Sequence, residues 1–286
     1  MSIDKKVNEL QQVEIKMLEK FVEVCSKLKL KYYLLAGTLL GAVRHKGFIP
    51  WDDDIDVGMP REDYEIFVKE AQKLLPEHYF IQTFETDPNY PANFAKIRDN
   101  NTTFIESSVR NLQMNHGAYI DVFPLDEYPD KNIKWFNFRR KYYTMCIYKG
   151  FNLEKKKKLK QFIARVLTMF TSVKKAVVKR ERLYKQSKGK KFLINFSGAW
   201  GEREITPSEW YGKGVDVQFE NLTVKAPDCW DLWLTQVYGD YMQLPPEEKR
   251  VSHHYSDMID CNSSYKNYIF NKGEWVKNSV NAKESV

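Results

Sequence analysis

The chain has 286 residues, of which 43% are hydrophobic and 29% are charged. This composition is typical of a soluble globular protein with one large domain or two small ones, and it excludes a disordered chain. No apolar run has the length of a membrane-spanning helix, because Arg165 and Thr168 interrupt the longest candidate at 162–170. The N-terminus lacks the apolar stretch of a signal peptide, and the four cysteines form no CxxC pair. We therefore expect a cytoplasmic protein without a structural zinc knuckle.

The net charge of +7 is unevenly distributed along the chain. Residues 155–191 contain 15 Lys and Arg against a single acid, Glu181, a local charge of +14. The remaining residues therefore sum to −7. An acidic body with one basic segment indicates a localised anionic partner.

Hydrophobic periodicity predicts a chain that contains both helices and strands. Apolar residues at steps of three and four indicate helices, and short apolar or alternating runs bounded by turn residues indicate strands. We expect helices over residues 10–28, 39–44, 60–75, 133–151, 155–184 and 228–238, and strands over 31–35, 54–58, 94–98, 102–106, 118–124, 192–196 and 217–224. The residues after 272 are polar and read as a loose tail.

The densest chemical signal is the acidic run Asp52-Asp53-Asp54-Ile55-Asp56. Acids this close raise one another's pKa unless a positive charge lies among them. One interpretation is a solvated acidic turn, but apolar residues flank the run tightly. A calcium loop is a second interpretation, but Val57 stands where that loop needs glycine and Pro60 lies inside it. The third is a metal–phosphate site with Asp54 and Asp56 as ligands, since both share one face of the expected strand.

The order of the surrounding residues favours the metal–phosphate site. Gly37 and Thr38 follow a predicted strand at the start of a helical turn, where backbone N–H groups and a hydroxyl can hold a phosphate. Asp121 is a lone acid on a later predicted strand. Phosphoryl transfer needs an amide cradle, two carboxylates for Mg²⁺, and a further carboxylate that holds a second metal or accepts a proton.

Basic residues near these positions are candidates for binding a diphosphate. Arg44 and His45 stand just after the Gly-Thr turn, although a basic surface loop has the same pattern. Lys96 and Arg98 share a face of a predicted strand, and pairing with nearby acids such as Asp99 is the alternative. His253-His254 and the tryptophans are weaker candidates, and Trp230 and Trp233 fit a helix core better than a ligand site.

Several of these stretches resemble the LicD family, which includes bacterial phosphorylcholine transferases and, more distantly, fukutin-related proteins. The similarity is carried by Leu-Ala-Gly-Thr-Leu-Leu-Gly-Ala-Val-Arg-His at 35–45, Gly-Phe-Ile-Pro-Trp-Asp-Asp-Asp-Ile-Asp-Val at 47–57, Ala-Lys-Ile-Arg at 95–98, Tyr-Ile-Asp-Val-Phe-Pro-Leu-Asp at 119–126, Tyr-Gly-Asp-Tyr-Met at 238–242 and Leu-Pro-Pro at 244–246. Residues 155–191 match no motif of that family.

The resemblance implies an α+β nucleotidyltransferase fold, a mixed sheet flanked by helices. It also implies an enzyme that uses Mg²⁺ and a nucleotide-activated donor such as CDP-choline. Gly37 and Thr38 match a Gly-Ser-like signature, Asp54 and Asp56 match the metal pair, and Asp121 matches the third acid. The implied reaction transfers phosphorylcholine to a sugar hydroxyl of a lipid-linked cell-surface glycan and releases CMP. CDP-glycerol or CDP-ribitol as the donor, or a non-catalytic binding protein on the same fold, are the alternatives.

We expect four parts in the chain on this basis: a nucleotidyltransferase-like core at 1–130, a basic helical insertion at 131–191, a C-terminal α/β portion completing the cleft at 192–272, and a polar tail at 273–286. The basic segment 155–191 is expected to contact an anionic membrane surface, with Phe162, Ile163, Val166, Leu167 and Phe170 as its apolar stripe. A nucleic-acid partner is not expected, because no recognised nucleic-acid module accompanies the charge. A helix packed on the body with solvated lysines is the alternative. The enzyme would then be peripheral at the inner face of the membrane.

Overall fold

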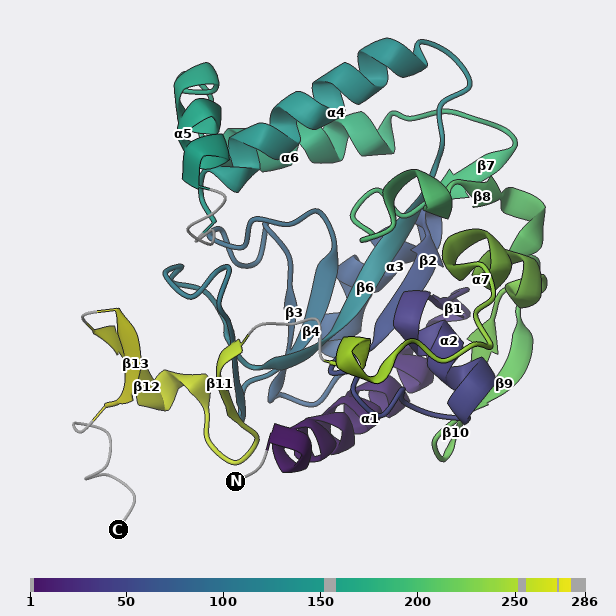
Figure 1. The fold of residues 1–286 in the computed structure, drawn as a ribbon, viewed down its shortest axis with the longest axis horizontal. Helices are drawn as coiled ribbons and strands as arrows, with labels where there is room; N and C mark the ends of the chain where they lie inside the picture. Colours follow the sequence, from purple (N-terminus) through teal and green to yellow (C-terminus); the bar gives the residue numbers. More distant parts are fainter. Residues whose placement is uncertain (1–2, 152–157, 252–255, 272, 279–286) are drawn as a thin grey trace.

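A computed structural model describes residues 3–151, 158–251, 256–271 and 273–278 (Figure 1). Its α-helices are α1 (Ile3–Leu28), α2 (Ala36–His45), α3 (Arg61–Glu70), α4 (Ile133–Tyr148), α5 (Lys158–Leu167), α6 (Val173–Lys185) and α7 (Trp230–Tyr238). The strands are β1 (Tyr33–Leu34), β2 (Asp56–Pro60), β3 (Tyr79–Gln82), β4 (Ala95–Asp99), β5 (Thr103–Glu106), β6 (Ala118–Glu127), β7 (Phe192–Ile194), β8 (Thr206–Pro207), β9 (Val215–Phe219), β10 (Leu222–Ala226), β11 (Ser256–Asp260), β12 (Tyr268–Asn271) and β13 (Glu274–Lys277).

The central sheet has the strand order β1-β2-β6-β4-β3, and β7 and β8 extend it from the far end of β6. Strands β2 and β6 are parallel, whereas β4 pairs with β6 and β3 with β4 in antiparallel fashion. The sheet is therefore mixed, and helices flank it, as the resemblance implied. The long strand β6 has neighbours on both sides and is buried over nearly its whole length.

One face of the sheet forms the main hydrophobic core. Val57 and Val122 are register partners on β2 and β6 and join a buried cluster with Leu10 and Phe21 of α1. Phe21 also packs edge-to-face on Phe67 of α3, with ring centroids 5.2 Å apart. The opposite face of the same strands is consequently left to residues such as Asp121.

Helices α4, α5 and α6 form a layer at the top of Figure 1, and α7 lies among the green segments that flank α2. Phe136 near the start of α4 packs with Leu183 near the end of α6, while Cys146 near the end of α4 packs with Ala176 near the start of α6. The two helices are therefore antiparallel. The expected helix over 155–184 is divided into α5 and α6, which residues 168–172 separate. Ser172 caps α6 by accepting a hydrogen bond from the Lys175 N–H.

Three expectations from sequence were wrong in detail. The strand expected over 54–58 begins at Asp56, so Asp54 lies in the segment before the strand and does not share a strand face with Asp56. Pro60 ends that strand and caps α3, which begins at Arg61 rather than at the proline. The stretch after residue 272 is not wholly a tail, because residues 274–277 form β13 in a hairpin with β12.

Candidate active site

The turn between β1 and α2 brings the chain close to the acidic run. Ala36 begins α2 with φ of 44°, a left-handed conformation that costs a residue with a Cβ about 1–3 kcal/mol. At Gly37 a Cβ would lie only 2.6 Å from Asp52 Oδ2. A side chain at position 37 would therefore have to displace the Asp52 carboxylate, which lies against the first turn of the helix.

Thr38 connects this helix to the strand that carries Asp56. Its Oγ1 accepts a hydrogen bond of 2.8 Å from the Asp56 backbone N–H, and the Leu35 N–H donates to the Asp56 carbonyl at 3.0 Å. Thr38 is buried. Its hydroxyl lone pair thus positions Asp56, and the hydroxyl proton is left for a further acceptor.

The acidic run forms a compact cluster of carboxylates. Ligand oxygens of Asp52, Asp53 and Asp54 all lie within 4.8 Å of one another, close enough to hold a single metal ion. Asp53 is 2% exposed. Carboxylate oxygens are hard ligands of the kind that Mg²⁺ and Ca²⁺ prefer, so the donor set fits such an ion. Sequence reasoning placed the metal pair at Asp54 and Asp56. It considered Asp52 only in the calcium-loop interpretation, and it missed Asp53 as a possible ligand.

A row of charged residues crosses the face of the sheet opposite the core. Asp56 of β2 is the register partner of Asp121 of β6, and Asp121 is in turn the partner of Lys96 of β4. Register partners project to the same face. The Lys96 ammonium pairs with Asp121 Oδ1 at 2.8 Å, and the Asp121 N–H donates to the Ile55 carbonyl at 2.8 Å. The structure thus brings Asp56, Asp121 and Lys96 together.

The pKa of Asp121 is raised, chiefly by burial and further by the negative charges of Glu106 and Asp54, whereas the Lys96 ammonium opposes the rise. This pattern ties Asp54 electrostatically to the same group. A buried carboxylate among acids accepts a proton more readily than an exposed one.

Arg98 lies on the same face, but its hydrogen bonds hold neighbouring parts of the fold together. It is fully buried, with Nε donating to Gln82 Oε1 and Nη1 donating to the Gly117 carbonyl, both at 2.7 Å. Its remaining Nη2 lies 3.4 Å from Glu106 Oε2, and the guanidinium stacks over the Tyr119 ring. Tyr119 also receives the Lys96 ammonium 3.2 Å from its ring centroid. Glu106 and Tyr119 were not found from sequence, although Tyr119 stands two residues from Asp121 and so shares its face.

Arg44 and His45 lie at the end of α2, in contact with the C-terminal part of the chain. Arg44 Nη1 donates to the Tyr241 carbonyl at 2.8 Å. Burial and the charge of Arg44 lower the pKa of His45, which favours a neutral imidazole. Arg250 stacks over Trp51, which directly precedes the acidic run. The pKa of Arg44 is lowered, chiefly by burial and further by the charge of Arg250. Two guanidinium groups, those of Arg44 and Arg250, thus lie around Trp51 and the end of α2.

Tyr238 at the end of α7 is a further neighbour of the acids. Burial raises its pKa, and the charges of Asp56 and Asp52 raise it further. Its ring contacts Trp200 edge-to-face at 4.8 Å between centroids. The resemblance included residues 238–242, but it gave no reason to expect a contact with the carboxylates. His253 and His254 lie outside the described residues.

Residues 29–155 of the chain match the family described as LicD/FKTN/FKRP, nucleotidyltransferase domain. The lipopolysaccharide cholinephosphotransferase LicD of Haemophilus influenzae is 32% identical over 259 residues, which cover 87% of this chain and 96% of that protein. The human ribitol 5-phosphate transferase FKRP is 48% identical over 64 residues, 21% of this chain and 13% of FKRP. An uncharacterized protein of Rickettsia prowazekii is 32% identical over 133 residues, 46% of this chain and 44% of that protein.

The mixed sheet with its row of charges, together with relatives named for the transfer of phosphate-linked groups, defines a transferase. The chain belongs to the LicD/FKTN/FKRP family. The family prediction from sequence is thereby confirmed.

Proposed function

We propose that this chain is a Mg²⁺-dependent enzyme that moves phosphorylcholine from CDP-choline to a sugar hydroxyl of a lipid-linked cell-surface glycan and releases CMP. The glycan would be of the teichoic acid, lipopolysaccharide or capsule type. The observation that carries the proposal is the alignment of Asp56 with Asp121 on neighbouring parallel strands, beside the Asp52–Asp54 cluster. The named activity of the Haemophilus relative, which matches nearly the whole chain, supports the choice of donor.

In the proposed reaction an acceptor hydroxyl attacks the phosphorus nearest choline. The new bond joins the sugar oxygen to that phosphorus, the bond to the bridging oxygen of the diphosphate breaks, and CMP leaves with the electron pair. Asp121 accepts the hydroxyl proton, and its raised pKa suits that role. The first turn of α2 at Gly37 and Thr38, together with Arg44, His45 and Lys96, holds the diphosphate, while Arg98 fixes the strands that carry Lys96 and Asp121.

The carboxylates of Asp52–Asp54 and Asp56 would hold the magnesium ion, and Asp121 either completes that site or acts only as the base. The bound ion would neutralise the charge that develops on the phosphate oxygens. A cation would also offset the mutual repulsion of the three clustered carboxylates of Asp52, Asp53 and Asp54.

Transfer activity tests the proposal directly. Purified protein incubated with CDP-choline, Mg²⁺ and a lipid-linked glycan should release CMP, and chelation with EDTA should stop the release. Asp56→Asn and Asp121→Asn should each lower kcat by at least about a hundredfold, the usual scale for a lost catalytic group. Asp257→Asn is the matched control, because Asp257 pairs with Arg110 at the surface. Unchanged turnover in Asp56→Asn and Asp121→Asn would overturn the assigned site.

Donor choice is decided by comparing CDP-choline with CDP-glycerol and CDP-ribitol. The short match to a ribitol 5-phosphate transferase makes CDP-ribitol the specific second candidate. A higher kcat/KM with CDP-ribitol would replace choline in the proposal without changing the site. A chain that binds these donors but turns over none of them would be a non-catalytic binding protein. The full set of acids argues against that alternative, because binding alone does not need it.

We also propose that segment 155–191 rests on the anionic inner face of the membrane, which would bring the enzyme to a lipid-linked acceptor. Helix α5 and the turn after it expose an apolar row, and Phe170 is 92% exposed. The exposed face of α6 is basic. The apolar residues are Leu159, Phe162, Ile163, Val166, Leu167, Met169 and Phe170, and the cations are Lys174, Lys175, Lys179 and Arg182. No helix among the described residues is long and apolar enough to cross a bilayer.

Flotation with vesicles tests this membrane contact. Each basic residue near an anionic surface adds about 1 kcal/mol to binding. Lys174→Glu/Lys175→Glu should therefore abolish flotation with phosphatidylglycerol vesicles, and Phe162→Ser/Phe170→Ser should weaken it. Lys213→Glu, a charge reversal outside this segment, is the control. Equal flotation of all variants would remove the membrane from the proposal.

A further inference from the structure

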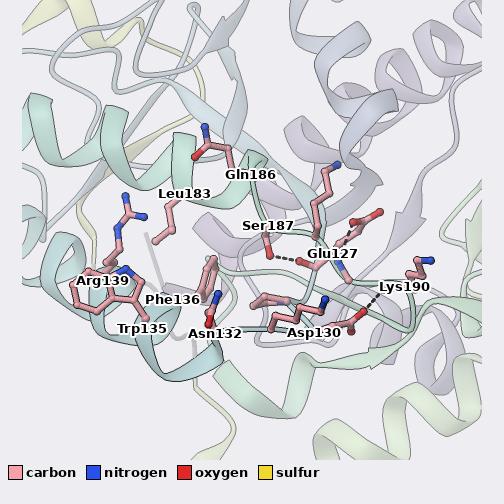
Figure 2. A pocket seen from close by; sticks show the side chains of 14 residues that line it. Glu127, Asp130, Asn132, Trp135, Phe136, Arg139, Leu183, Gln186, Ser187 and Lys190 are labelled. Atoms are coloured by element: carbon pink, nitrogen blue, oxygen red, sulfur yellow. Dashed lines mark hydrogen bonds between the residues drawn. The ribbon is translucent and has the colours of Figure 1, made fainter.

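A cavity of about 700 Å³ lies at the other end of β6 from Asp121 (Figure 2). Glu127, the last residue of β6, lines it, six residues beyond Asp121 on the same strand. At about 3.3 Å per residue the cavity is about 20 Å from the carboxylate row. It contains none of the residues to which we assign the transfer reaction, and its volume is in the range of about 300–1,000 Å³ typical of ligand pockets.

The floor of this cavity is apolar, and one wall is aromatic. Phe136 and Leu183, both buried, form the packed floor between α4 and α6. Trp135 lines the cavity while remaining 61% exposed, and Arg139 lies one helical turn further along α4. Figure 2 shows Trp135 and Arg139 together at one end of the cavity and Lys190 at the other. A ring placed on Trp135 would thus have a guanidinium beside it.

The opposite wall is a basic loop that hydrogen bonds hold in place. Ser187 Oγ donates to the Glu127 carbonyl at 2.6 Å, and the Gly189 N–H donates to Glu127 Oε2 at 3.1 Å. The Lys190 N–H donates to Asp130 Oδ2 at 3.1 Å. Gly189 is needed because a Cβ there would lie 1.8 Å from the Tyr128 carbonyl oxygen. The loop is therefore preorganised, which lowers the entropic cost of binding a ligand.

The charges around the cavity do not cancel. Four cations line it, namely Lys131, Arg139, Lys188 and Lys190, against the two carboxylates of Glu127 and Asp130. Both carboxylates accept backbone N–H bonds from the loop, and within the described part of the chain none of the four cations forms an ion pair. Helix α4 also begins here, and its N-cap Asn132 makes no side-chain cap, so the positive end of the helix adds to the field.

We propose that this cavity binds a phosphate-bearing sugar of the glycan acceptor, with the sugar ring on Trp135 and the phosphate among Arg139, Lys188 and Lys190. The inference rests on the proposed transfer reaction for the identity of the glycan, but not for the chemistry of binding. A nucleotide donor whose diphosphate lies at Asp56 and Asp121 does not extend to this cavity. The site would therefore hold the acceptor chain at a distance from the hydroxyl that reacts.

Calorimetry with the full-length protein tests the site without any transfer reaction. The probes are glucose 6-phosphate, glucose, inorganic phosphate and CMP. We expect glucose 6-phosphate to bind more tightly than glucose or phosphate alone, because it uses both halves of the cavity. Trp135→Ala and Lys188→Gln/Lys190→Gln should each weaken its binding at least about fivefold, whereas Lys141→Gln, an exposed lysine of α4 outside the cavity, should change it less than about twofold.

Each other outcome overturns the proposal. If inorganic phosphate binds as tightly as the sugar phosphate, Trp135 holds no ring. If glucose binds as tightly as glucose 6-phosphate, the cations have no role. If Trp135→Ala weakens CMP more than glucose 6-phosphate, the cavity is a nucleotide site. Asp56→Asn should keep full affinity for glucose 6-phosphate, so a failure of the transfer reaction is distinguishable from a failure of this site.

Discussion

Replacing Arg61 by methionine should be among the most damaging single changes outside the charged row. Its Nε and Nη2 each donate to Asp126 at 2.7 Å, and its Nη1 donates to Glu181 at 2.7 Å. Asp126 lies on β6 and Glu181 on α6, so one guanidinium joins α3, the central strand and the helical layer. Glu181 is also the single acid of the basic segment.

The magnitude follows from what Arg61→Met leaves behind. Two carboxylates with side chains 3% and 8% exposed lose their main cationic partner. Breaking a buried pair by removing one partner costs about 3–5 kcal/mol, against a total stability of about 5–15 kcal/mol. Burial already raises the pKa of both acids, and Arg61 opposes that rise. Without Arg61 the two pKa values rise further. The loss in the free energy of unfolding should therefore have its full size above neutral pH, and it should shrink as pH falls toward the pKa values of the two acids in the unfolded chain.

Urea unfolding followed by circular dichroism at pH 5 and pH 8 measures this loss. Arg110→Met is the matched control, since Arg110 pairs with Asp257 at the surface and its removal should cost less than about 1 kcal/mol. Adding Asp126→Asn and Glu181→Gln to Arg61→Met should recover much of the stability. The reasoning is refuted if the Arg61 and Arg110 variants lose equal stability, or if the Arg61 loss is the same at both pH values.

Three further predictions concern the candidate site and its surroundings. Thr38→Val removes the acceptor of the Asp56 N–H and should cost about 1–3 kcal/mol in urea unfolding, whereas Thr38→Ser should cost much less; equal losses would contradict the bond. Gly37→Ala pushes a methyl group against Asp52 Oδ2. It should lower Mg²⁺-dependent CMP release at least about tenfold, while the free energy of unfolding falls by only about 1–2 kcal/mol. Full activity would contradict the contact. Burial raises the pKa of Glu204 from 4.5 to about 7. Between these two pH values the folded state keeps a proton that the unfolded state releases. The free energy of unfolding should therefore fall by up to about 3 kcal/mol as pH rises from 4.5 to 7. Glu204→Gln should flatten that fall in denaturant midpoints measured at pH 5 and pH 8, and an unchanged slope would assign it to another group.

Much of the fold was predictable, because local patterns determine it. Side chains alternate along a strand, so a strand over 118–124 turns Ile120 and Val122 away from Asp121, and both lie in the core. The Trp-rich helix α7 also formed as predicted, with Trp233 in the core. The single strand expected over 217–224 was wrong in detail, because the chain turns after Phe219 and forms the hairpin of β9 and β10. Hydrophobic spacing gives the face of a strand, but it does not give the strand's neighbours. The pairing of Asp56 with Asp121 and Lys96 therefore required the structure.

The parts of the site that sequence missed depend on long-range packing. Lys96 pairs with Asp121, whereas Arg98 is fully buried against Tyr119. Nothing in the spacing of these two residues in the sequence predicts this difference. The basic cavity was missed because its residues come from three elements. A signal was present, however: Trp135 and Arg139 are one helical turn apart, and Lys188-Gly189-Lys190 has the composition of a phosphate-binding turn. The predicted division into four parts, with boundaries at 130, 191 and 272, stays a prediction.

The charged row has a consequence for folding as well as for chemistry. Its members come from three strands and meet only when β2, β6 and β4 are aligned to the residue. A slip of one position in β6 would exchange Asp121 for Ile120 or Val122, which would turn the acid into the hydrophobic core and an aliphatic side chain toward Asp56 and Lys96. The hydrophobic core cannot accommodate that exchange. The packing of α1 against the sheet therefore favours the strand register that aligns the acids. A molecule that completes its core has, by the same event, assembled its carboxylates.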